Sequence, residues 1–168
     1  MKTILLITMF CAVTCFAQAQ EFTKAAAQLE PKSGSQVTGM VTFTKVGDEI
    51  QVVADIQNLK PGKHGFHIHE KGDCSAADAA SAGAHFNPTQ KHHGGPMNLD
   101  HHTGDLGNIE ADASGKAHLD WKGKLSFTGK DSIIGRSVVV HEKEDDLKTD
   151  PSGNSGARIA CGAINAAN

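Results

Sequence analysis

Alternating apolar and polar residues mark most of the chain beyond its first thirty positions. Residues 37–46 and 49–56 alternate in this way and flank Gly47-Asp48, a sequence typical of a turn, so they predict a β-hairpin. Further short strands are expected over residues 65–69, 106–111, 117–121, 125–128, 133–141 and 157–164. Eight or so short strands with glycine-rich turns predict an all-β protein, an antiparallel sandwich or flattened barrel.

The stretch before the first hairpin is ambiguous. Residues 23–29 are rich in alanine, which favours a helix by propensity alone. Pro31 and the sequence Ser33-Gly34-Ser35 follow directly, and residues of this kind typically form a turn. We therefore expect a first strand here.

Two stretches lack any periodic pattern. Residues 71–104 are rich in Gly, Ala, His, Asp and Asn, and residues 142–156 form a second polar stretch. A structureless loop as long as the first is unusual inside a compact domain unless something orders it. A metal ion or a disulfide could do so, because this stretch contains five histidines and Cys74. We expect two long functional loops.

The first nineteen residues carry the pattern of an export signal. A lysine precedes the apolar run 4–13, and Ala17-Gln18-Ala19 supplies the small residues typical of a cleavage site. We expect a signal peptide over residues 1–19, removed by cleavage at its end, and one domain over residues 20–168. A lipoprotein anchor at Cys15 is the alternative.

Charge and cysteine content narrow the possible partners. The formal net charge is −3 and no run of basic residues occurs, so nucleic acid is not an expected partner. No apolar run after the signal is long enough for a membrane-spanning helix. Cleavage would leave Cys74 and Cys161, and an even pair in an exported chain suggests one disulfide, with two unrelated buried thiols as the alternative.

Ten histidines are many for this length, and two of them lie in the sequence Gly65-Phe66-His67-Ile68-His69. Side chains alternate between the faces of a strand, so His67 and His69 would share one face, about 7 Å apart along it. Phe66 and Ile68 would point into a core. Such a pair is suited to metal binding, although on its own it is more often a surface pair or a hydrogen-bonded one.

Six segments, spread through most of the mature chain, are informative together: HGFHIHE at 64–70, SAGAHFNP at 81–88, HHGGP at 92–96, HHTGDLGN at 101–108, IIGRSVVVHEKEDD at 133–146 and GARIACG at 156–162. In these segments the chain resembles the copper/zinc superoxide dismutases. The resemblance implies an eight-stranded antiparallel Greek-key sandwich or flattened barrel. It also implies one copper and one zinc ion per subunit.

The resemblance assigns the metal ligands residue by residue. It places copper on His67, His69, His85 and His141. It places zinc on His85, His93, His102 and Asp105. The resemblance implies that His85 is shared between the two metals as a bridge, a role that needs the two opposed nitrogen donors of an imidazole.

Two pairs of neighbouring histidines require a choice. The resemblance selects His93 rather than His92, because His93 directly precedes two glycines, as the family's ligand does. His102 rather than His101 is expected, because it lies three residues before Asp105. The other member of each pair is expected at the surface.

The resemblance implies that Cys74 and Cys161 form a disulfide. It also assigns supporting roles to two further residues. Asp145 matches a carboxylate that links a copper histidine, here His67, to the zinc histidine His93. Composition alone would make it a solvated charge. Arg158 matches an arginine that holds a small anion beside the copper.

The implied activity is dismutation of superoxide to dioxygen and hydrogen peroxide, by alternating reduction and oxidation of copper beside a structural zinc. The resemblance gives the catalytic roles to Arg158 and to His85, whose bridge opens at copper as the ring gains a proton. It further implies a homodimer and antioxidant defence in the periplasm or outside the cell. The alternatives are a non-catalytic copper-binding or copper-delivery protein on the same fold and a binding sandwich with incidental histidines.

The chain mixes features of two branches of this family. The chain resembles bacterial members in the short segment from His69 to Cys74 and in the inserted residues 75–80. It resembles eukaryotic members in the segments HEKEDD and HTGDLGN. The stretch 142–156 is shorter than the typical eukaryotic loop, and the acidic pair that guides superoxide there has no clear counterpart. We therefore expect weaker electrostatic steering and leave the dimer surface open.

Overall fold

The computed structural model describes residues 22–167, so the expected signal peptide and the alternative anchor at Cys15 lie outside the described residues. The described chain forms nine strands and two short 3-10 helices. The strands are β1 (Lys24–Pro31), β2 (Thr38–Val46), β3 (Glu49–Gln57), β4 (Gly62–His69), β5 (Asp105–Ala111), β6 (Ala117–Gly123), β7 (Ser137–His141), β8 (Arg158–Ala163) and β9 (Asn165–Ala167). The helices are η1 (Ala80–Ala82) and η2 (Gly129–Asp131). Between residues 22 and 167 no helix is long and apolar enough to cross a membrane.

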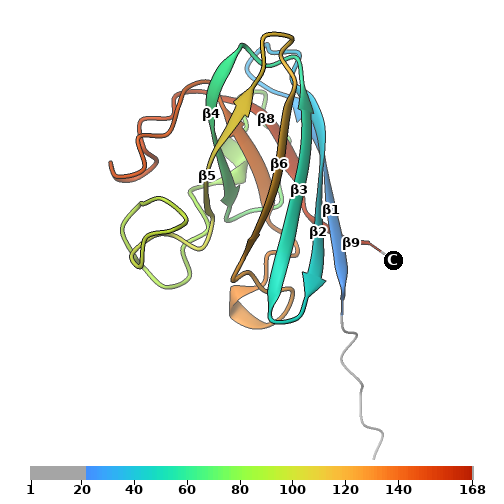
Figure 1. Ribbon diagram of the computed structural model, residues 1–168, viewed down its shortest axis with the longest axis vertical. Helices are drawn as coiled ribbons and strands as arrows, with labels where there is room; N and C mark the ends of the chain where they lie inside the picture. The colour runs from blue at the N-terminus through green and yellow to red at the C-terminus, as the bar shows by residue number, and fades with distance from the viewer. Residues whose placement is uncertain (1–21, 168) are drawn as a thin grey trace, which may run out of the picture.

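The strands close into an antiparallel barrel (Figure 1). Their order is β2-β3-β6-β5-β4-β7-β8-β1, and β1, the alanine-rich segment, pairs back to β2 over residues 24–29. β8 and β9 together occupy one strand position of the barrel, because β1 pairs with both in the same register. Glu30 lies opposite Cys161 of β8, and Ala26 lies opposite Asn165 of β9. The barrel therefore has eight strand positions, as expected.

The connections follow a Greek key. β3 lies beside β6, whereas β4 lies between β5 and β7. The chain therefore crosses between distant strand positions after β3 and again after β6. β5 and β6 pair only at Ala111 and Ala117, beside their connecting turn. Backbone pairing between these two neighbouring strands is therefore almost absent. The antiparallel Greek-key prediction is confirmed.

β4 is buried on both faces, and this feature positions the site. Phe66 and Ile68 belong to the hydrophobic core inside the barrel. On the opposite face, His67 and His69 are 0% and 1% exposed. Antiparallel sheets commonly leave one face to solvent. Here that face must be covered by other parts of the chain.

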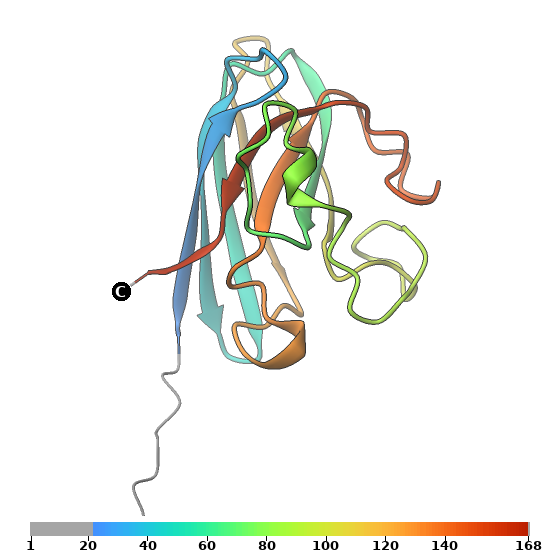
Figure 2. The same cartoon turned by 180° about the vertical axis from the view of Figure 1, so that it is seen from behind.

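Two long loops cover it. The first loop (residues 71–104) lies directly on β4, where Ile68 donates its N–H to Gly104 O and accepts from the N–H of Phe86, each at 2.8 Å. The second loop (residues 142–156) follows β7, and the carbonyl of its residue Lys143 accepts the N–H of Gly65 at 2.8 Å. Both loops project from the same flank of the barrel (Figure 1 and Figure 2).

A disulfide ties the first loop to the barrel. The sulfurs of Cys74 and Cys161 are bonded, and the two residues are 87 positions apart in sequence. A link of this span restricts the unfolded chain enough to stabilise the fold by about 4.6 kcal/mol in the chain-entropy model. Cys161 lies on β8 opposite Val139 of β7, so the first loop is attached beside the strand that ends in His141. The expected pairing is confirmed.

Two local expectations are wrong, and one short strand was missed. Residues 125–128 form no strand, and only one isolated bridge is made there, at Ser126. Residues 133–136 turn ahead of β7, with Gly135 at φ 76°, although Ile133 is fully buried. The apolar residues of both stretches pack into the core from irregular backbone, which hydrophobic pattern alone does not distinguish from a strand. The short β9 was not expected.

Candidate metal centre

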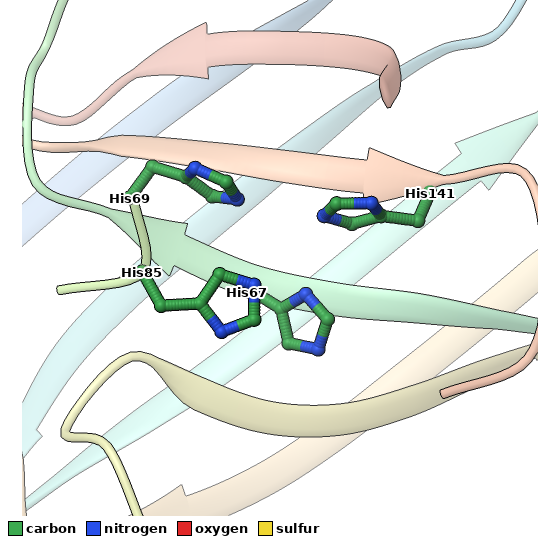
Figure 3. Close-up of side chains that lie close together, drawn as sticks. All are labelled: His67, His69, His85 and His141. Carbon is green, nitrogen blue, oxygen red and sulfur yellow. The ribbon is translucent and has the colours of Figure 1, made fainter. Parts of the chain in front are cut away.

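Four histidines meet on the covered face of the barrel (Figure 3). His67 and His69 alternate on β4, and His141 ends the neighbouring strand β7. His85 comes from the first loop and is joined to His69 by an isolated bridge. Gly65 leaves room for the His67 ring and for Ser155 of the second loop, because a Cβ there would lie 3.0 Å from Cε1 of His67 and 2.8 Å from Cβ of Ser155.

Seven side chains that could bind a metal form two groups, and the groups share one member. The first cluster is His67, His69, His85 and His141. The second cluster is His85, His93, His102 and Asp105. In each cluster every residue is buried and offers one ligand atom, and these atoms lie within 4.8 Å of one another. The structure thus brings together every residue that the resemblance assigned to copper and to zinc.

Asp105 organises the second cluster. Its Oδ1 lies 2.8 Å from His85 Nδ1, 3.1 Å from His93 Nδ1 and 3.2 Å from His102 Nδ1. Its Oδ2 accepts the main-chain N–H groups of Gly94 at 3.1 Å and His102 at 2.9 Å. These backbone bonds fix the carboxylate so that one oxygen faces three imidazoles.

His85 belongs to both clusters through its two nitrogens. Nδ1 faces Asp105 in the second cluster, whereas Nε2 is buried with no hydrogen-bond partner. The rings of His85 and His67 have centroids 4.1 Å apart, and those of His85 and His69 are 5.0 Å apart. One imidazole therefore separates two groups of ligand atoms, as a bridging ligand requires.

Unpartnered nitrogens test whether the clusters suit metals. Within the described part of the chain, six buried ring nitrogens make no hydrogen bond: Nδ1 of His67, His93 and His102, and Nε2 of His69, His85 and His141. For His93 and His102 the nearest polar atom is Asp105 Oδ1, at 3.1 and 3.2 Å, which is itself a member of the second cluster. A buried polar atom without a partner costs about 1–3 kcal/mol, so six in one place call for a ligand. Every one of them belongs to a cluster histidine.

In five of the six rings, all but that of His102, the opposite nitrogen makes a hydrogen bond, and it orients the ring. His69 Nδ1 lies 2.9 Å from Gly83 O, and His141 Nδ1 lies 3.3 Å from Gly156 O. A carbonyl only accepts, so each Nδ1 carries the proton and Nε2 presents its lone pair to the cluster. Imidazole donors suit copper and zinc, and a carboxylate suits zinc. The residues present therefore fit both metals.

Asp145 joins the two clusters from the second loop. Its Oδ2 lies 2.7 Å from His67 Nε2, and its Oδ1 lies 2.9 Å from His93 Nε2. Asn108 on β5 holds the backbone of Asp145 through two hydrogen bonds of 2.8 and 2.9 Å. The carboxylate thus contacts the two histidines that the resemblance named, at the nitrogens facing away from the cluster centres.

Burial and charge set the protonation of the clusters. Burial lowers the pKa of His85 to about 4 and those of His69 and His141 well below their ordinary value, so these rings are neutral donors near pH 7. Burial also opposes protonation of His93, but Asp105 and Asp145 outweigh it and raise that pKa to about 10. The second cluster therefore favours a cation among its ligands.

A cleft leads to the first cluster. It has a volume of about 230 Å³ and is lined by His69, Ala84, His85, His141, Pro151, Ser152, Gly156 and Arg158. Arg158 Nη1 donates to Ala79 O at 2.8 Å, which fixes the half-buried guanidinium at the cleft. Burial lowers the pKa of Arg158, but a guanidinium remains charged at neutral pH. The cleft therefore offers a cation beside the ligand atoms of the first cluster.

The four remaining histidines make other contacts. His118 on β6 is exposed and lies 2.8 Å from Asp55. His92 is exposed and lies 2.7 Å from Asp150, and His101 is half-buried and lies 2.6 Å from the carbonyl of its neighbour His102. Buried His64 is held between two backbone carbonyls, each 2.8 Å away. None of these rings enters a cluster.

Sequence analysis missed three supporting residues. Asn108 and Asp150 hold loop backbone, and Gly153 packs over the contact between Asp145 and His93. The sequence gives no signal for Gly153, because Asp145 and His93, which it packs against, lie 8 and 60 residues away in the chain.

Comparison with known proteins agrees with this geometry. A family model described as copper/zinc superoxide dismutase (SODC) matches residues 37–164. The extracellular superoxide dismutase [Cu-Zn] of Drosophila melanogaster is 50% identical, over 77% of this chain and 76% of that protein. The protein of the same name from Caenorhabditis elegans is 41% identical, over 98% of this chain and 78% of that protein. A crystal structure of the clock protein EA4 superposes with a TM-score of 0.80 and 41% identity, covering 87% of this chain and 96% of that chain.

Replacing Gly153 by alanine should loosen the second cluster. A Cβ at this position would overlap Asp145 Oδ1 and lie 2.8 Å from His93 Nε2, so one of the two side chains must move. Disturbing a group that orients a metal ligand typically costs about 10- to 100-fold in metal affinity. We therefore expect Gly153→Ala to weaken zinc binding about 10-fold or more, measured by competition with a chromophoric chelator.

Gly47→Ala is the matched control. Gly47 has φ +63° against +62° for Gly153, and nothing lies within 4 Å of its added Cβ. It therefore carries the same backbone strain without the clash. Equal zinc affinity in the two variants would contradict the role given to Gly153.

Proposed function

The chain belongs to the copper/zinc superoxide dismutase family, and we propose that it converts two superoxide anions and two protons into dioxygen and hydrogen peroxide at the first cluster. The observation that carries this proposal is the set of six buried, unpartnered ring nitrogens divided between two clusters that share His85. A binding sandwich with incidental histidines would not leave these nitrogens unpaired together.

The ligand assignment follows from the donor atoms. Copper would be held by His67, His69, His85 and His141, a set made only of imidazoles. Zinc would be held by His85, His93, His102 and Asp105, three imidazoles and a carboxylate. Bound copper supplies the one-electron redox change that both halves of the reaction need.

His85 would handle one of the two protons. Its Nδ1 stays in the second cluster beside Asp105, and its Nε2 faces the first cluster. Because burial lowers its pKa to about 4, the ring does not hold a proton on both nitrogens near pH 7. We infer that His85 Nε2 takes up a single proton in one half-reaction and releases it in the other.

Arg158 would bind the substrate. Its guanidinium lines the cleft beside His85 and His141, and a charged hydrogen-bond donor suits a small anion. The chain as a whole is negative at −3, so local positive charge at the cleft has to attract superoxide. Salt screens such an attraction.

Copper-dependent loss of superoxide tests this function. We expect rapid loss when the protein is loaded with copper and zinc, and none above background when it carries zinc alone. Pulsed generation of superoxide with optical detection of its decay measures both rates. Failure of the copper-loaded protein, with both metals demonstrably bound, would contradict the proposal.

Arg158→Ala separates an enzyme from a copper-delivery protein. Losing a hydrogen bond to a charged group is worth about 1.5–3 kcal/mol, so the rate should fall about 10-fold or more while copper stays bound. Lys148→Ala removes an equal charge from an exposed position of the second loop that does not line the cleft, and should change the rate little. An unchanged rate in Arg158→Ala would remove this residue from the mechanism.

We also propose that the protein is exported, after cleavage of a signal peptide over residues 1–19, to the periplasm or the cell exterior. Two similar proteins are named extracellular superoxide dismutases, which supports export. Cleavage would leave residues 20–168 as the enzyme domain, and mass spectrometry of the secreted protein should find Gln20 at its amino terminus. By analogy with the family we propose a homodimer, whose mass in solution would be twice that of this domain.

A further inference from the structure

The two long loops meet at Asp150, a residue to which the preceding sections give no role in the reaction. Its Oδ1 accepts the main-chain N–H of His93 at 2.7 Å. Its Oδ2 lies 2.7 Å from Nδ1 of His92. One carboxylate of the second loop thus contacts two successive residues of the first loop.

His93 depends on this contact for its backbone position. It lies in residues 87–104, a stretch with no strand and no helix among the described residues. Its Nε2 is hydrogen-bonded to Asp145 at 2.9 Å, and its Nδ1 faces Asp105 Oδ1 at 3.1 Å. Those contacts fix the ring only if the backbone places it within reach. A main-chain N–H makes one good hydrogen bond, and here Asp150 accepts it.

Pro151, which follows Asp150 in the chain, links the hydrogen bond of Asp150 to the spaces beside both clusters. Pro151 lines the cleft that contains Arg158, and it also lines a separate hollow of about 260 Å³ beside Glu70, Asn87 and His102. His85 borders both spaces. Asp150 therefore fixes the segment of the second loop that lies between the approaches to the two clusters. Its proline restricts the backbone of Asp150 itself, which favours a single placement of the carboxylate.

The ion pair with His92 contributes little. The side chains of His92 and Asp150 are 79% and 51% exposed, and exposed pairs of this kind are weak. The hydrogen bond to the main chain of His93 differs, because His93 is buried and belongs to the second cluster. The position needs an acceptor oxygen at Oδ1 more than it needs a negative charge.

We propose that Asp150 is a positioning residue for the second cluster: through the main-chain N–H of His93 it places that imidazole for zinc. This inference rests on the proposed function, because it takes the second cluster to be the zinc site. It extends that function to a residue outside both ligand sets.

Three variants and a control separate the contributions. Asp150→Ala removes both contacts, Asp150→Asn keeps an acceptor oxygen in the same place, and His92→Gln removes only the exposed pair. Lys148→Ala lies two residues away in the same loop and serves as the control. Zinc affinity is measured by competition with a chromophoric chelator. The visible absorption of Co²⁺ in the second cluster reports the ligand geometry independently of any activity.

We expect Asp150→Ala to weaken zinc binding about 10-fold or more, because removing a group that orients a metal ligand usually lowers metal affinity on this scale. The variant should also alter the Co²⁺ spectrum. Asp150→Asn, His92→Gln and Lys148→Ala should stay within about threefold of the parent, because each keeps the hydrogen bond to His93. Rescue by the asparagine distinguishes positioning through an acceptor oxygen from a general effect of charge.

Parent-like zinc affinity in Asp150→Ala would overturn the proposal, and so would an equal loss in Asp150→Asn. If the parent protein itself bound no zinc and gave no tetrahedral Co²⁺ spectrum, the proposed function would fail with it. Should Asp150→Ala not fold, amide hydrogen exchange at His93 in the parent protein decides. Protection of that N–H supports the proposal, and rapid exchange overturns it.

Discussion

Six imidazole nitrogens that are buried without hydrogen-bond partners constrain the rest of this structure. Burial strips water from these atoms, and among the described residues none of them makes a hydrogen bond, although two face Asp105 Oδ1, so a ligand has to complete them. Each of their rings also needs an orientation, because a lone pair that points elsewhere cannot bind a metal. The hydrogen bonds from His69 to Gly83, from His141 to Gly156 and from His67 to Asp145 supply that orientation. The backbone of both long loops is therefore part of the metal centre.

This dependence runs in both directions. The loops contain few apolar residues that reach the core, and they are held instead by polar contacts and by one disulfide. Asp145 joins a strand histidine to a loop histidine, and Asn108 attaches Asp145 to β5. Metals at the two clusters would cross-link the same elements again. Because a metal that binds only the folded state stabilises that state, we expect the loops and the sites to gain order together.

The sequence predicted the barrel and the ligands for different physical reasons. Alternation identified the strands because one face of each strand packs into the core, as in β3, where Ile50, Val52, Ala54 and Ile56 are all buried. The ligands were found through segments that resemble a known family, since their loop has no period of its own. The roles of Asp150 and Gly153 could not be predicted, because they arise where two irregular loops touch. The strand expected over residues 125–128 is absent because buried side chains such as Phe127 pack into the core from irregular backbone as readily as from a strand.

The shared imidazole of His85 is the central claim, and magnetic coupling tests it most directly. The protein is loaded with Cu²⁺ in the first cluster and either Zn²⁺ or Co²⁺ in the second, and the Cu²⁺ electron paramagnetic resonance signal is compared. Zinc is diamagnetic and leaves the signal intact, whereas cobalt joined to copper through one imidazole should strongly reduce it. A Cu²⁺ signal of equal intensity with either metal would show that His85 does not bridge the two sites.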